Sequence, residues 1–81
     1  MKATLSVDNT YADGYQQTIV YNDVEIPTPT DLTDPDYWAS DHLYEYTGTG
    51  TGRENVDAVY TVTIVAADIP ELVGYEIEFG I

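Results

Sequence analysis

The chain has 81 residues, of which 43% are hydrophobic, and its 15 acidic and two basic side chains give a formal net charge of −13. This length predicts one domain, residues 1–81, with a core of modest size. The absence of cysteine excludes a disulfide framework and thiolate metal sites, and the charge excludes anionic partners such as free nucleic acid and anionic membrane surfaces.

The first third of the chain has the pattern of a β-sheet. In ATLSV, residues 3–7, apolar and polar side chains alternate, which predicts a strand with one buried face. The turn-forming residues of DNTYADG, 8–14, predict a connection. It leads to a second strand over 15–21, in which alternate side chains again share one face.

A short third strand is predicted next. Asn22–Asp23 has the composition of a tight turn, and VEI at 24–26 follows it as a strand. The two prolines of PTPT, residues 27–30, cannot donate hydrogen bonds to a ladder, so they end this part of the sheet.

A short helix is predicted near residues 34–43. Either Thr33 caps it, with Asp36 at the capping-box spacing, or Asp34 caps it and Pro35 takes the first helical position. In both cases the early aspartates lie at the positive end of the helix dipole, where negative charge is favourable.

The C-terminal half is predicted to complete the sheet. Alternation predicts strands in YEYTG at 44–48, in AVYTVTIVA at 58–66 and in YEIEFGI at 75–81. A glycine- and threonine-rich loop over 47–55 and either a turn or one helical turn over 68–74 connect them. The sequence therefore predicts an α+β fold, a mainly antiparallel sheet of five or six strands with one short helix.

No constellation of residues predicts catalysis or a bound ion. Asp31, Asp34 and Asp36 miss the ligand spacing of an EF-hand calcium loop. A looser metal site formed by Asp34, Asp36, Asp41 and His42 is weaker than helix capping as an explanation of these side chains. His42, the only histidine, has no cysteine or GxSxG serine to activate, and TGTGTG lacks the ending of a phosphate-binding loop. We therefore expect no enzyme, no cofactor and no metal site.

The acidic residues are the remaining candidates for function. Duplex DNA carries one charge per about 1.7 Å of axis, so thirteen charges match roughly 22 Å of duplex. Carboxylates accept bidentate arginine as phosphates do, and interleaved aromatic rings stack on guanidinium groups. We expect a partner-binding surface made of Asp31, Asp34, Asp36, Trp38, Asp41, Tyr44, Glu45, Glu54, Asp57, Glu76 and Glu78.

Within this set, one continuous negative face is expected. Glu76 and Glu78 share a side of the last strand about 6.6 Å apart, a spacing of the same order as that of DNA phosphates. The helix aspartates and Glu45 are expected to lie on the same side as this pair, with Asp34, Asp36 and Asp41 in the place of phosphates.

The acidic stretch TDPDYWASDHLYE and the outward glutamates of YEIEF, in a small chain with two basic residues, resemble the DNA mimics encoded by phages, particularly anti-CRISPR proteins. The resemblance implies an inhibitor that occupies the basic DNA-binding surface of a host CRISPR effector complex, type I favoured, and blocks target DNA binding. We expect it to act in the host cytoplasm as a monomer or small homo-oligomer, without binding nucleic acid or a membrane.

Other functions remain open. The first alternative is an inhibitor that occupies the DNA-binding surface of a restriction enzyme or another DNA-binding enzyme. The near absence of lysine also fits a salt-adapted structural or accessory domain of viral or haloarchaeal origin. The tyrosines and Trp38 fit a protein-interaction or carbohydrate-binding β domain. A mimic should gather its acids on one face, a salt-adapted domain should spread them all round, and a carbohydrate binder should present a coplanar aromatic platform.

Overall fold

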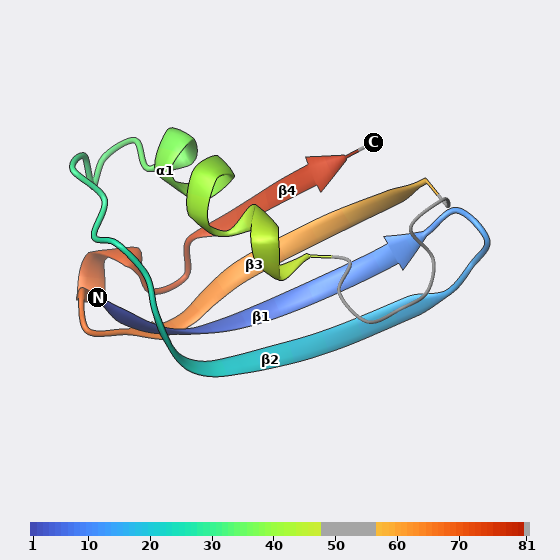
Figure 1. Ribbon diagram of the computed structural model, residues 1–81, viewed down its shortest axis with the longest axis horizontal. Coiled ribbons are helices and arrows are strands. Elements are labelled where there is room, and N and C mark those ends of the chain that lie inside the picture. Colours follow the sequence, from blue (N-terminus) through green and yellow to red (C-terminus); the bar gives the residue numbers. More distant parts are fainter. Residues whose placement is uncertain (48–56, 81) are drawn as a thin grey trace.

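The computed structural model describes residues 1–47 and 57–80 as an antiparallel sheet with one short helix (Figure 1), which confirms the α+β class. The described ranges contain four strands, in the order β2-β1-β3-β4, rather than five or six. In chain order the elements are β1 (Lys2–Tyr11), β2 (Gln16–Glu25), α1 (Asp36–His42), η1 (Tyr44–Tyr46), β3 (Ala58–Ala67), η2 (Pro70–Leu72) and β4 (Glu76–Gly80). Neither α1 nor the two 3₁₀ turns are long and apolar enough to span a membrane.

β1 is longer than the sequence predicted. We expected a strand over 3–7 and a connection over 8–14, but the strand continues to Tyr11. The connection is reduced to the four residues 12–15, in which the Tyr11 N–H donates to the Tyr15 carbonyl at 2.9 Å and Gly14 has a φ of +93°. Glycine adopts this conformation at little cost. Pairing with strands on both sides overrides the local turn preference of DNT.

The turn predicted at Asn22–Asp23 is a β-bulge within one long strand. β2 runs through it, so 24–26 is not a separate strand. Between Leu5 and Ala3 of β1, β2 has one extra residue, and Asp23 takes a φ of +54°. Asn and Asp tolerate this left-handed conformation better than most residues, which explains why a turn-like dipeptide serves as a bulge. β3 carries an extra residue opposite the same stretch of β1.

α1 begins two residues later than predicted, at Asp36, with Pro35 at its N-cap and no capping side chain. Neither the Thr33 cap nor the Asp34 cap therefore forms. Instead Asp31 Oδ1 accepts hydrogen bonds from the backbone N–H and the hydroxyl of Thr33, at 2.9 and 2.6 Å, and this Asx turn shapes the approach to the helix.

Residues 44–46 form the 3₁₀ turn η1, and the strand predicted over 44–48 is wrong for this part. Leu43, directly before the turn, is fully buried. The ring of Tyr46 lies 5.1 Å from that of Tyr21 on β2, and the ring of Tyr44 lies 5.1 Å from that of Phe79 on β4. The two tyrosines therefore contact the two opposite edge strands of the sheet, and these tertiary contacts override the strand that their alternation predicted.

The C-terminal elements agree with the sequence. β3 extends the strand predicted over 58–66 by one residue, η2 is the predicted turn within 68–74, and β4 lies within 75–81. Beyond Thr47, the glycine-rich loop predicted over 47–55 lies outside the described residues.

α1 and η1 cover one face of the sheet, and the core lies between them and the strands (Figure 1). Its fully buried side chains are Leu5, Val7, Val62, Ile64, Ala39, Leu43 and Leu72. A smaller cluster of Tyr11, Ala58 and Tyr60 lies toward the β1–β2 turn. The opposite face has no described element over it. We call it the open sheet face, formed by Lys2, Thr4, Ser6, Asp8, Thr10, Gln16, Thr18, Val20, Glu25, Val59, Thr61, Thr63, Val65, Glu76 and Glu78.

Candidate partner-binding surfaces

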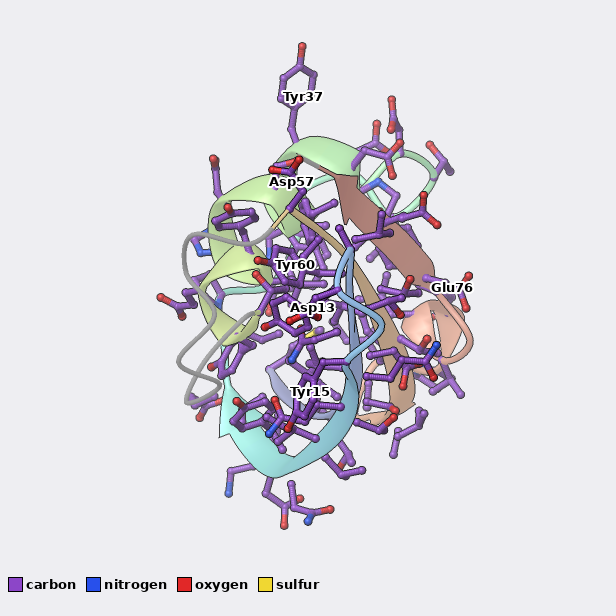
Figure 2. The ribbon with its side chains drawn as sticks, turned by 90° about the vertical axis from the view of Figure 1, so that its right-hand side faces the viewer. Asp13, Tyr15, Tyr37, Asp57, Tyr60 and Glu76 are labelled. Carbon is purple, nitrogen blue, oxygen red and sulfur yellow. The ribbon has the colours of Figure 1, made fainter. Side chains whose placement is uncertain are left out.

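The segment between β2 and the end of η1 carries a dense set of exposed acidic and aromatic side chains. We call it the helix-side surface, formed by Asp31, Leu32, Asp34, Asp36, Tyr37, Asp41, Tyr44 and Glu45. Tyr37 is its most prominent member, because 88% of the residue is exposed and the ring stands clear of the fold (Figure 2). Leu32 and Tyr44 are also large apolar side chains with 41% and 50% exposure. A surface that combines carboxylates with exposed aromatic rings suits a cationic partner.

The helix-side surface is held in place by the buried side of α1. Ala39 and Leu43, four residues apart, are fully buried in the core. Trp38 Nε1 donates to the Pro27 carbonyl at 2.6 Å, and its ring lies 6.3 Å from that of His42, four residues further along the chain. Because these contacts fix the helix rotation, Tyr37 and Asp41 are left pointing outward.

A second connection joins the start of α1 to the sheet. The Tyr75 hydroxyl, next to β4, donates a hydrogen bond to the Asp36 carboxylate. Burial raises the pKa of Tyr75, and the hydrogen bond to Asp36 and the negative charges of Asp36 and Asp34 raise it further. The phenol therefore stays neutral and keeps its proton for the carboxylate.

Hydrogen bonding also perturbs Asp31. The Thr33 hydroxyl and then the Thr33 backbone N–H stabilise the ionised carboxylate and lower the pKa of Asp31. The first acid of the helix-side surface is therefore a charged side chain that is already oriented by its own turn.

The predicted contact residues lie in three separate places. Six of them belong to the helix-side surface: Asp31, Asp34, Asp36, Asp41, Tyr44 and Glu45. Trp38 lies beside them but is half-buried, with its N–H bonded to Pro27. Asp57 lies beside the β1–β2 turn, where its carbonyl accepts the Ala12 N–H at 2.8 Å. Glu76 and Glu78 lie on the open sheet face, and Glu54 lies outside the described residues.

The expectation of one continuous negative face is therefore wrong. Ile77 and Phe79 pack against the core beneath α1, and the period of two along a strand points Glu76 and Glu78 the opposite way. Figure 2 shows Glu76 directed away from the side of the sheet that α1 covers. The helix aspartates and these glutamates lie on opposite sides of the sheet.

Besides Glu76 and Glu78, the open sheet face contains Asp8 and Glu25, two acids that the sequence did not single out. Asp8 accepts a hydrogen bond from the Thr18 hydroxyl at 2.6 Å, and Glu76 accepts one from the Thr63 hydroxyl at 3.3 Å. Glu25 lies 3.6 Å from the Met1 ammonium. Continuing the alternation of residues 3–7 by one step would have placed Asp8 on this face. All fourteen carboxylates of the described residues are exposed.

No arrangement in the described ranges points to an ion or a stacked sugar. They contain no group of three or more His, Cys, Asp or Glu residues able to hold a metal ion. Five aromatic ring pairs are in contact, at interplanar angles from 50° to 89°, so none of these five pairs forms a coplanar platform. Comparison with known proteins finds no matching family model, no matching curated protein and no matching solved structure.

Proposed function

We propose that this protein inhibits a DNA-binding protein by presenting the helix-side surface to the basic groove that normally holds DNA. The favoured target is a type I CRISPR effector complex in the host cytoplasm. The alternative target is a restriction enzyme or another DNA-binding enzyme, because its DNA-binding groove would bind the same acidic side chains. The observation that supports this proposal best is the position of Tyr37, 88% exposed, among five exposed carboxylates.

The chemistry of the helix-side surface suits arginine. Asp34, Asp41 and Glu45 are exposed, and a carboxylate accepts a guanidinium group through two parallel hydrogen bonds, as a phosphate does. Tyr37 offers a ring face on which a guanidinium plane stacks. Lys2 is the only lysine or arginine of the described residues, and it lies on β1, away from this surface. Nothing cationic on the described part of the helix side therefore competes with an incoming partner.

The test is a competition between this protein and target duplex DNA for a purified type I effector complex. We expect stoichiometric displacement of DNA that weakens steeply with salt, because exchange against phosphate contacts is electrostatic. A triple variant, Asp34→Asn with Asp41→Asn and Glu45→Gln, should lose most of the inhibition.

The matched control removes the same number of charges from the open sheet face: Glu25→Gln with Glu76→Gln and Glu78→Gln. It should inhibit nearly as well as the unmodified protein. Equal losses in both triple variants would mean that total charge and not the helix-side surface is responsible. Absence of any inhibition, in this complex and in a panel of restriction enzymes, would overturn the proposal.

A second candidate function is a salt-adapted structural or accessory domain. Acids on both sides of the sheet, rather than on one face, are what this alternative predicts. Exposed carboxylates hold water and cations in concentrated salt and keep an acidic protein dispersed. The competition experiment separates the two candidates, because salt adaptation by itself predicts no displacement of DNA.

A further inference from the structure

The two edges of the sheet differ in length and charge. β4, one edge, has five residues and exposes Glu76 and Glu78. β2, the other edge, has ten residues, and none of those from Gln16 to Asn22 is charged. Proteins protect free edges with short strands, charges or bulges, because an unpaired edge pairs with another strand. β4 has the first two protections, and most of β2 has none.

The backbone of β2 offers a regular set of free hydrogen-bonding groups. In an antiparallel ladder, residues alternate between facing the partner strand and facing away from it. The Tyr11 N–H donates to the Tyr15 carbonyl, so the backbone groups of Tyr15 face β1. The backbone groups of every second residue after Tyr15, as far as the bulge, face β1 as well. Gln16, Thr18 and Val20 therefore turn their N–H and C=O groups outward. Within the described ranges, β2 pairs with β1 alone.

The charge around this edge indicates what pairs with it. The nearest acids along the chain are Asp13, in the turn before β2, and Asp23, in the bulge, and the nearest across the ladder is Asp8 of β1, which accepts the Thr18 hydroxyl on the open sheet face. The opposite edge, α1, η1 and η2 all carry exposed carboxylates. A basic partner is attracted to those carboxylates and gains nothing from an uncharged strand. An equally acidic copy of this chain is repelled by them, and it approaches most closely at β2, where exposed carboxylates are fewest.

We propose that two copies of this chain pair β2 with β2, antiparallel about a two-fold axis, and join their four-stranded sheets into one. Gln16, Thr18 and Val20 of each copy supply the new ladder. Val20, now 53% exposed, and Ile19, half-buried and in neither core cluster, each gain a neighbour across the axis. This self-association leaves the helix-side surface free and does not depend on the proposed function.

The test is the mass in solution by sedimentation equilibrium at about 0.1 M and about 1 M salt, where the Debye length is about 10 Å and about 3 Å. We expect a dimer whose association constant rises with salt, because screening reduces the repulsion between two charges of −13. Binding of a basic partner has the opposite salt dependence, so failure of one proposal is distinct from failure of the other.

Two variants locate the interface. Val20→Glu and Val59→Glu each add one carboxylate to the open sheet face, at positions with 53% and 41% exposure, but only Val20 lies on an edge strand. Val20→Glu should weaken dimerisation at least about tenfold, a loss of about 1.4 kcal/mol, and Val59→Glu should leave it nearly unchanged.

Val20→Pro provides a second arm, because it removes an outward N–H and leaves the β1–β2 ladder its donors. It should give a monomer, and Val20→Thr, which keeps the N–H, should stay dimeric. A monomer at every salt concentration, or equal effects of Val20→Glu and Val59→Glu, would overturn the proposal.

Discussion

Tyr75 and Asp36 are thirty-nine positions apart in the chain, and their hydrogen bond joins the start of β4 to the start of α1. A tyrosine at a strand boundary usually keeps its hydroxyl in water, as amphipathic rings do. Here the hydroxyl finds a carboxylate at the first residue of a helix that no side chain caps. This contact is therefore a specific link between the two layers of the fold.

Replacing Tyr75 by Phe should lower the free energy of unfolding at neutral pH by about 0.5–1.5 kcal/mol, the net value of one hydrogen bond. The raised pKa of Tyr75 means that folding favours the neutral phenol. Its contribution is fully present below the ordinary tyrosine pKa of 10.0 and is lost as the pH rises through the folded value. Urea unfolding at neutral and alkaline pH measures both effects, and Tyr75→Phe should lose less stability in alkali than the unmodified protein.

Tyr37→Phe is the control for this measurement, since Tyr37 is 88% exposed and has no described hydrogen bond. It should match the unmodified protein at both pH values. If Tyr75→Phe lost as much stability in alkali as the unmodified protein, ionisation of Tyr75 would have no part in alkaline unfolding.

At the scale of elements, the strands that could be read from the sequence are those whose alternation decides burial. Tyr60, Val62 and Ile64 alternate along the strand predicted over 58–66, and all three are buried. The errors came where a local signal competed with tertiary contacts. The alternation in Tyr44–Tyr46 predicted a strand, but the rings of Tyr44 and Tyr46 contact two different strands and the segment forms a 3₁₀ turn. The dipeptide Asn22–Asp23 suits a tight turn and a β-bulge equally well, so its composition does not tell which one forms. Propensity alone does not separate these outcomes.

The bulge makes a prediction about Asp23. Its φ of +54° is costly for a β-branched residue, so Asp23→Val should destabilise the fold by about 1–2 kcal/mol. Asp23→Gly should be neutral or stabilising, because glycine accepts this conformation. Glu25→Val, which removes an equal charge from the same strand at an ordinary position, is the control and should cause no comparable loss. Thermal unfolding followed by circular dichroism measures all three, and equal melting of Asp23→Val and Asp23→Gly would contradict a strained bulge.

At the scale of the whole molecule, the acidic residues could be counted from the sequence, but the sequence did not show which of them share a face of the sheet. The outward positions of Glu76 and Glu78 were predicted, and Ile77 and Phe79 between them pack against the core on the opposite face. The side taken by the helix aspartates depends on which face of the sheet α1 covers, and no local pattern encodes that choice. The prediction of one continuous negative face was therefore wrong because the packing of the helix on the sheet could not be predicted. Most of the elements that carry these acids were expected.

Fourteen exposed carboxylates on a molecule of net charge −13 repel one another in the folded state. Added sodium chloride should therefore raise the melting temperature, and each kcal/mol gained corresponds to about 4–8 °C for a domain of this size. Either triple neutralised variant should show a smaller salt response. A melting temperature that is independent of salt would mean that self-repulsion does not limit stability.

The contact of Trp38 with Pro27 also gives the molecule an optical label on its helical layer. The only tryptophan lies in α1, hydrogen-bonded to the segment that leaves β2, whereas the tyrosines are divided between the strands and the helical segments. Indole emission therefore reports whether the helix is seated, and circular dichroism of the backbone reports the sheet. The two layers of this fold can be followed together without any added dye, so detachment of the helix is distinguishable from loss of the sheet.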